Sequence, residues 1–252
     1  MGVQSDEALL LEVRDLHDAD RVVSFLTRER GKKRGVARSA RRKHSRFAGQ
    51  LQPLAKARIT WFEKEGRDLV RISSIELLRS AHRLQADLDG ILLTAYLADH
   101  TAEFAQEDEP GEHLYRLLDS TLEALLAGAD RDLAARYFEA WALRLQGIFP
   151  PPRLCPICGR DFAEAGAVLP AEGEGLLCAE CGGRGRGALR VSPEALDFLR
   201  RTARQGLTEM ARRPPPPAAL RAAEELTGHV RRRFLHRELR SYEVMKRIEA
   251  RT

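Results

Sequence analysis

The fold of this chain is decided by residues 18–39, which read DADRVVSFLTRERGKKRGVARS. Residues 21–27 are rich in Val and Phe, Gly31 follows as a turn signal, and residues 33–39 alternate small or apolar side chains with basic ones. Alternation with a period of two is typical of strands that bury one face. The stretch therefore predicts two short strands joined by a turn.

Three further stretches, on either side of this one, have the same character. Residues 9–13, 56–62 and 69–75 alternate or concentrate apolar side chains, and Asp, Gly and Pro residues separate them. Five short strands within about 70 residues suit a small closed barrel, because closure removes exposed strand edges. A five-stranded OB-fold β-barrel is favoured, with an SH3-like barrel as the alternative. We expect Trp61 in the core, because it shares a strand face with Ile59.

Beyond the last of these stretches, apolar residues recur at steps of three and four. Such steps run through residues 77–96, 114–125 and 133–148, and a final set runs through 218–249. Each set predicts an amphipathic helix whose apolar stripe packs against its neighbours. Ser192-Pro193-Glu194 predicts the start of another helix. Ser is a preferred cap, Pro fits the first turn, and Glu favours the positive end of the helix dipole.

Basic side chains are concentrated in one short block. The net charge of +5 conceals a net +9 between Arg28 and Arg46, −8 over residues 81–150 and +8 over residues 200–252. A block of like charge repels itself, and nucleic-acid phosphates are the commonest anions that neutralise one. A solvated charged face is the alternative interpretation. The candidate DNA-binding residues are Lys32, Lys33, Arg34, Arg38, Arg41, Arg42, Lys43 and Arg46.

Two further features fit nucleic-acid binding. Phe47 and Phe62 are candidates for stacking on bases. With so few aromatic candidates, we expect mostly electrostatic and weakly sequence-selective binding. The final predicted helix carries a second basic cluster, which would contact DNA or receive an acidic peptide tail; a solvated helix face is the alternative. The residues of this cluster are Arg231, Arg232, Arg233, Arg237 and Arg240.

All four cysteines lie in one 27-residue window, as Cys155-Pro156-Ile157-Cys158 and Cys178-Ala179-Glu180-Cys181. Two C-x₂-C knuckles at this separation are a strong signature of a tetrahedral zinc site, because each tight turn brings two thiolates to one side of the ion. Disulfides are disfavoured in a cytosolic chain, and a redox pair needs no partner pair. Four protein thiolates leave no open coordination position, so we expect structural Zn²⁺.

These patterns predict an α+β chain with two domains. The expected ranges are an OB-fold DNA-binding domain over residues 1–78 and an α-helical bundle over residues 79–252, with the zinc knuckle inserted at 153–187. Four consecutive prolines at 214–217 predict a semi-rigid spacer before the final helix.

Several function classes are disfavoured by what the sequence lacks. It has no Walker-type phosphate loop, no dinucleotide fingerprint after a strand, no H-E-x-x-H pair and no G-x-S-x-G elbow. We therefore favour a binding protein over an enzyme. No apolar stretch approaches the roughly 18–20 residues that a membrane span needs. The first apolar run has no cationic region ahead of it, so we expect a cytoplasmic protein.

Segments spread over nearly the whole chain, from about residue 7 to residue 248, resemble one known family. They are residues 18–23, 26–32, 36–42, 45–49 and 51–53, then 136–141, the two cysteine pairs, and 192–196. In this order they resemble the bacterial recombination mediators of the RecO family. The N-terminal run is fairly specific to that family, whereas the cysteine pairs alone would not be. The prolines at 214–217 depart from the family pattern.

The resemblance implies an N-terminal OB domain, a helical bundle and an inserted zinc knuckle that stabilises the fold. It also implies binding of single- and double-stranded DNA and annealing of complementary strands. The implied partners are RecR and the acidic C-terminal tail of the single-strand DNA-binding protein, with loading of RecA at gaps as the outcome. Family members act stoichiometrically without nucleotide hydrolysis, which implies a non-enzyme in the cytoplasm, at the nucleoid.

Two other classes lead to different expectations. A zinc-containing regulator of transcription or of RNA would give a sequence- or RNA-specific footprint without annealing, and it would need a base-reading helix that the sequence does not show. A nuclease would need clustered acids for metal ions. The carboxylates of residues 81–150 are instead spread along predicted helix faces.

Overall fold

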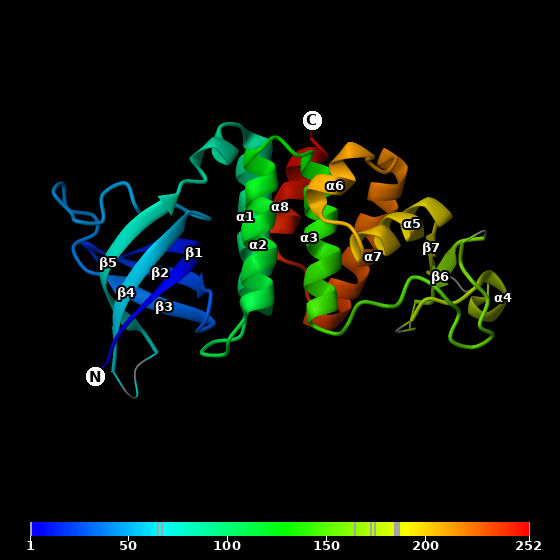
Figure 1. Cartoon of the computed structure of the whole chain (residues 1–252), viewed down its shortest axis with the longest axis horizontal. Helices are drawn as coiled ribbons and strands as arrows, with labels where there is room; N and C mark the ends of the chain where they lie inside the picture. Colours follow the sequence, from blue (N-terminus) through cyan, green and yellow to red (C-terminus); the bar gives the residue numbers. More distant parts are fainter. Residues whose placement is uncertain are drawn as a thin grey trace. The chain divides into compact units, whose positions relative to one another are not determined.

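The N-terminal part of the chain is a closed five-stranded barrel. A computed structural model describes residues 2–64, 66, 68–163, 165–171, 173, 175–183 and 187–251. The strands are β1 (Gly2–Leu16), β2 (Asp20–Thr27), β3 (Lys32–Ala37), β4 (Lys56–Glu63) and β5 (Val70–Arg79). Their order around the barrel is β1-β2-β3-β5-β4 (Figure 1). The β3–β5 pair is parallel and the other pairs are antiparallel, which is the OB arrangement that the sequence predicts.

The barrel core is built from alternate residues of these strands. Trp61 is fully buried beside Ile59, as expected, and its ring meets that of Phe25 edge-on with centroids 5.7 Å apart. The indole N–H of Trp61 donates to Glu63 at 3.1 Å, so its polar atom is satisfied. Edge-on aromatic pairs of this kind add to the free energy gained from burial alone.

The chain forms two compact units, and the first is discontinuous. It comprises Met1–Leu126 together with Leu239–Thr252, whereas the second comprises Ala127–Glu238. The predicted domain boundary between residues 78 and 79 stays a prediction. In the first unit, η1 (His82–Gln85), α1 (Leu88–Phe104), α2 (Glu112–Leu126) and α8 (Arg240–Glu249) accompany the barrel.

Ion pairs and packing hold these helices in the first unit. Asp119 of α2 accepts from Lys56 of β4 at 2.9 Å and from Arg79 of β5 at 2.6 Å, which ties α2 to the barrel. On α8, the Ser241 hydroxyl donates to Asp99 of α1 at 2.6 Å. Residues from the far end of the sequence therefore complete the packing around α1.

The second unit is mainly helical. Its helices are α3 (Arg131–Leu145), α4 (Ala179–Gly182), α5 (Pro193–Thr202), α6 (Leu207–Arg212) and α7 (Pro217–Leu235), and β6 (Ala167–Leu169) pairs with β7 (Leu189–Val191). As predicted, Ser192 caps α5 by accepting from the Ala195 N–H, and Pro193 occupies the first turn. The last of the four prolines begins α7.

Two helix predictions differ from the structure. The helix expected from Leu77 onward begins only at Leu88, because β5 continues to Arg79 and Asp87 supplies the helix cap. The final helix expected over residues 218–249 is two helices, because His236 adopts a left-handed conformation with φ 56° and ends α7. The paired leucines after Ile75 fit a strand or a helix, and the basic stretch around His236 fits a continuous or a broken helix. The spacing of apolar residues therefore could not predict where β5 and α7 end.

Candidate nucleic-acid interface and metal centre

The predicted DNA-binding cations lie on two neighbouring parts of the barrel. One group belongs to β3, where residues 32–34 begin the strand. The other belongs to the segment 38–50 between β3 and β4, which we call the basic loop. The two groups differ in what surrounds their charges.

The basic loop has a defined conformation on the barrel. The Ser39 N–H donates to Asp20 at 2.7 Å, and the Arg41 N–H donates to the Ala19 carbonyl at 3.0 Å. Successive turns follow, and Phe47 is buried in the barrel core at 1% exposed. The loop is thus anchored at its start and again toward its end.

The side chains of this anchored loop project a concentrated positive charge. Arg41 contacts Asp15 at 3.5 Å, and the Arg46 guanidinium lies over the Phe47 ring. Arg38, Arg42 and Lys43 are exposed and form no ion pair with the part of the chain that the structure describes. Unpaired cations on a fixed loop are available to phosphates at no cost from breaking an internal pair.

The β3 cations, in contrast, are already paired. Lys33 is only 11% exposed and contacts Glu63 at 2.6 Å as well as Asp108. Partial burial opposes the charge on Lys33, but hydrogen bonds to Asp108 and Glu63 outweigh it and raise its pKa. The same hydrogen bond from Lys33 lowers the pKa of Glu63, with a further contribution from the Trp61 N–H. Lys32 donates to the Ala102 carbonyl at 2.7 Å, and Arg34 contacts Glu107 at 3.4 Å.

The two candidate stacking residues are placed differently. Phe62 lies on β4 and is 37% exposed, so its ring is accessible to a base. Phe47 packs inside the barrel and presents no ring to solvent, because it is the apolar anchor of the basic loop. The sequence offered no periodic signal for this burial, since polar or basic residues precede Phe47 and only the small residues Ala48 and Gly49 follow it directly.

The residues of the predicted second basic cluster have different surroundings. Arg231 is 1% exposed and donates to Glu238 at 2.5 Å, so its charge serves the interior of the second unit. Arg232 shares the same carboxylate at 3.2 Å, and Arg233 donates to the Gly173 carbonyl at 2.6 Å. Arg237 and Arg240 are exposed, and Arg240 belongs to α8 in the other compact unit.

The four cysteines come together as the spacing predicts. Their sulfur atoms all lie within 4.8 Å of one another. In the first knuckle, the Gly159 N–H donates to the Cys155 carbonyl at 2.8 Å, and Gly159 has φ 72°, a conformation that favours glycine. In the second, Cys178 caps α4 and its sulfur accepts from the Cys181 N–H at 3.4 Å.

The sulfur geometry fits a tetrahedral metal ion. Zinc–sulfur bonds of about 2.3 Å place neighbouring sulfurs about 3.8 Å apart. The sulfurs of Cys158 and Cys178, which belong to different knuckles, lie 3.6 Å apart. Arg160 and Glu180 form an ion pair of 2.6 Å that joins the two knuckles from outside. The residues present could therefore bind a metal ion through four thiolates.

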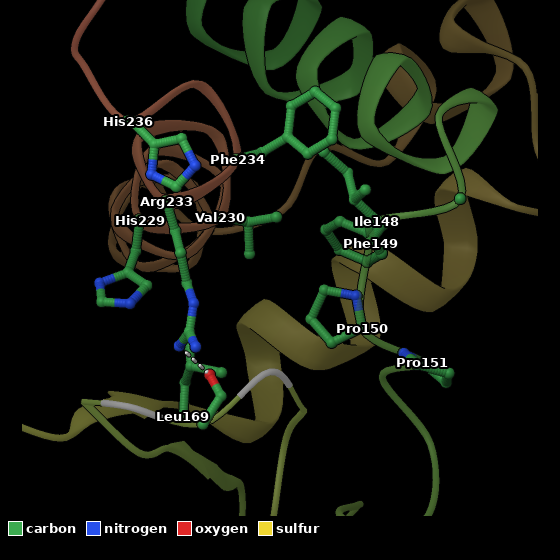
Figure 2. Close-up of a pocket in the computed structure, with 12 residues that line it drawn as sticks. Ile148, Phe149, Pro150, Pro151, Leu169, His229, Val230, Arg233, Phe234 and His236 are labelled. Atoms are coloured by element: carbon green, nitrogen blue, oxygen red, sulfur yellow. Dashed lines mark hydrogen bonds between the residues drawn. The ribbon is translucent and has the colours of Figure 1, made fainter.

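A pocket of about 710 Å³ lies in the second unit, and no sequence pattern indicates it. Figure 2 shows apolar side chains on one side, among them Ile148, Phe149 and Phe234, and the polar side chains of His229 and Arg233 on the other. Burial and the nearby positive charges lower the pKa of His229. Such a lining suits a ligand with one apolar and one anionic part.

No helix in the described part of the chain combines the length and the hydropathy needed to cross a membrane.

Two family models match the sequence. "Recombination protein O N terminal" matches residues 1–81, and "Recombination protein O C terminal" matches residues 85–243.

Curated relatives agree with these models along the whole chain. A protein of Anaeromyxobacter sp. (strain K) is 35% identical over 234 residues, which are 91% of this chain and 92% of that protein. One from Myxococcus xanthus is 32% identical over 96% of this chain and 97% of its own length. One from Desulforamulus reducens is 28% identical over 98% and 96%. Each is named DNA repair protein RecO.

Proposed function

The chain belongs to the RecO family of DNA repair proteins, and from this we propose that it is a recombination mediator that anneals complementary single strands. With RecR, it would help to load RecA onto DNA that is coated by the single-strand DNA-binding protein. It would act by binding and releasing strands, without a catalytic step of its own.

The exposed basic loop is the observation that carries this proposal. Three of its cations, Arg38, Arg42 and Lys43, are unpaired within the described residues and belong to a loop of the closed barrel. Contacts from such residues go to phosphates, which gives binding with little sequence preference. Neutralising phosphates also lowers the repulsion between two strands, and this reduction favours annealing.

Charge reversal on the basic loop tests the proposal. We expect the triple variant R38E/R42E/K43E to bind single-stranded DNA at least about 10-fold more weakly at low salt. Its salt slope should fall by about 2, since each lost phosphate contact removes about 0.7. Annealing of strands precoated with the single-strand DNA-binding protein should fall in parallel.

The matched control reverses three exposed arginines of the second unit, as R204E/R212E/R221E, which changes the net charge equally. Equal losses in both triple variants would show that only net charge matters and would contradict a loop-based interface. Unchanged affinity in R38E/R42E/K43E would contradict it as well.

The pocket in the second unit supports a second part of the proposal, the contact with the single-strand DNA-binding protein. The tail of that protein is acidic, so its binding site needs positive charge. Arg233 and His229 supply polar groups beside Phe149 and Phe234. We therefore propose that the tail docks in this pocket.

A peptide-binding measurement tests this docking. With a synthetic peptide of the cognate tail, R233E should bind about 10-fold more weakly, because removal of a charged partner costs roughly 1.5 kcal/mol or more. R221E, on the exposed part of the same helix, should bind as the unmodified chain does. Equal binding by all three proteins would place the tail elsewhere.

The cysteine site has a structural role in this proposal. Zn²⁺ bound by Cys155, Cys158, Cys178 and Cys181 would brace the two knuckles of the second unit. Because four thiolates would occupy all four coordination positions of a tetrahedral ion, no position would be left for a substrate.

A further inference from the structure

One short acidic segment lies on the basic β3 strand. It comprises residues 106–112, which read QEDEPGE and run from the connection after α1 to Glu112, the first residue of α2. The Lys32 N–H donates to the Gln106 carbonyl at 3.0 Å, and the Asp108 N–H lies 3.4 Å from the Lys32 carbonyl. Lys32 and Glu107 form an isolated parallel β-bridge, so the backbone of residues 106–108 lies against the start of β3.

The start of β3 has one edge that does not pair with β5, and the acidic segment lies at this edge. β5 pairs with β3 only at Gly35 and Val36, and the acidic segment contacts the earlier part of the strand. At the preceding turn, Gly31 has φ 69°, and a Cβ there would overlap the carbonyl oxygen of Glu109. The backbone of the acidic segment is thus seated directly on the turn that leads into β3.

Three of the four carboxylates of the segment each contact a neighbouring cation. Asp108 contacts Lys33, Glu107 contacts Arg34 at 3.4 Å, and Glu112 contacts Arg28 at 3.9 Å. A groove of about 540 Å³ is lined by Lys33, Arg34, Glu107 and Asp108 among others, and so by both signs of charge. The segment therefore presents a row of anions to β3, as a nucleic-acid backbone would.

The ion pairs of the acidic side chains are of a kind that another anion can replace. Asp108 is 72% exposed although its partner Lys33 is only 11% exposed, and both members of the Arg34–Glu107 and Arg28–Glu112 pairs are about half exposed. Exposed ion pairs contribute little to stability and are screened by salt, so a competing polyanion can replace them. The basic loop at residues 38–50 has no such cover over Arg38, Arg42 and Lys43 among the described residues.

We propose that residues 106–112 are an autoinhibitory element that occupies the phosphate positions of β3. DNA would first contact the exposed basic loop and would reach Arg28, Lys33 and Arg34 only by displacing the acidic segment. The element would weaken binding of short or isolated strands and favour strands long enough to cover both sites. This inference rests on the proposed DNA binding and adds a competitor inside the chain.

Neutralising the acidic segment gives the test. We expect E107Q/D108N/E112Q to bind single-stranded DNA about 10-fold more tightly at low salt, with a salt slope steeper by about 2 as three further phosphate contacts form. The control D197N/E225Q/E243Q removes three exposed carboxylates elsewhere and makes the same change in net charge. It should show a much smaller gain.

The possible outcomes separate this inference from the proposed function. If the unmodified chain binds DNA but E107Q/D108N/E112Q gains no more than the control, the autoinhibitory role is overturned and DNA binding stands. If the unmodified chain does not bind DNA at low salt, the proposed function itself fails.

Hydrogen exchange of the unmodified chain gives a second, independent readout. Because the Lys32 N–H is bonded to Gln106, displacement of the segment should speed exchange at Lys32 and across residues 106–111 when DNA is added. Unchanged or slower exchange there would overturn the proposal even if E107Q/D108N/E112Q folds poorly.

Discussion

At the scale of single residues, Glu63 shows how one carboxylate can serve both packing and charge. It accepts from the buried Trp61 indole and from Lys33, and these contacts lower its pKa below the ordinary value of 4.5. A lowered pKa in the folded state means that the carboxylate stabilises the fold above pH 4.5. This contribution is lost as the pH falls through the lowered pKa.

We therefore predict that E63Q lowers the free energy of unfolding at pH 7 by up to about 1 kcal/mol, since the site is partly exposed and screened. The amide still accepts from Trp61, so the charge alone is removed. The difference from the unmodified chain should shrink as the pH falls below 4.5 in denaturant titrations. E29Q, on an exposed turn, serves as control, and a difference that persists at pH 3 would contradict the prediction.

Single-residue environments were only partly predictable from the sequence. Trp61 could be assigned to the core because its strand alternates regularly with Ala57 and Ile59. Phe47 and Arg231 could not be assigned, because the burial of each depends on distant partners. Phe47 joins a core built by other strands, and Arg231 depends on Glu238 beyond the helix end.

At the scale of elements, the two cysteine knuckles are short turns with few contacts of their own. β6 and β7 are three residues each, and α4 has four. Elements this small have little apolar surface to bury, so a bound metal ion commonly stabilises them. The knuckles should therefore depend on metal more than the rest of the second unit does.

The corresponding prediction concerns metal removal. The full chain should contain one zinc ion, and either a strong chelator or C158S should remove it. Hydrogen exchange across residues 154–163 and 175–183 should then become faster, while single-stranded DNA affinity of the barrel changes less than about 2-fold. Loss of zinc without faster exchange would show that the knuckles fold unaided.

Element types were predicted well where the periodicity was long, and element ends were not. The five strands and the first turn of α5 follow from local alternation and capping. The end of β5 and the break at His236 depend on contacts made elsewhere, such as those of Arg79 with Asp119. The pairing of β3 with residues 106–112 joins positions some 75 apart, which local patterns do not encode.

At the scale of the whole molecule, the first unit needs both ends of the sequence. Tyr242 of α8 packs against Tyr96 of α1 with ring centroids 5.5 Å apart, and Met245 is buried. Ser241 bonds to Asp99 through both its hydroxyl and its backbone N–H. Helix α8 thus completes the packing of the helices in the first unit.

We predict that truncation after residue 238 destabilises the first unit although it leaves every barrel strand intact. Uncovering the Tyr96 face of α1 should lower the melting temperature of the first unit by several degrees, because a loss of one kcal/mol in unfolding free energy lowers the melting temperature of a small domain by about 4–8 °C. Y242A should show a smaller shift of the same sign. V244S, at an exposed position, is the control, and an unshifted truncated protein would contradict the prediction.

The split of the first unit also has a consequence for synthesis of the protein. Residues 127–238 must all be translated before residues 239–252 exist, and at about 5–20 residues per second these roughly 110 residues take about 6–22 s. During that interval the first unit lacks α8, while the inserted second unit can already fold. On the ribosome, the part of the chain that emerges first is therefore the part that matures last.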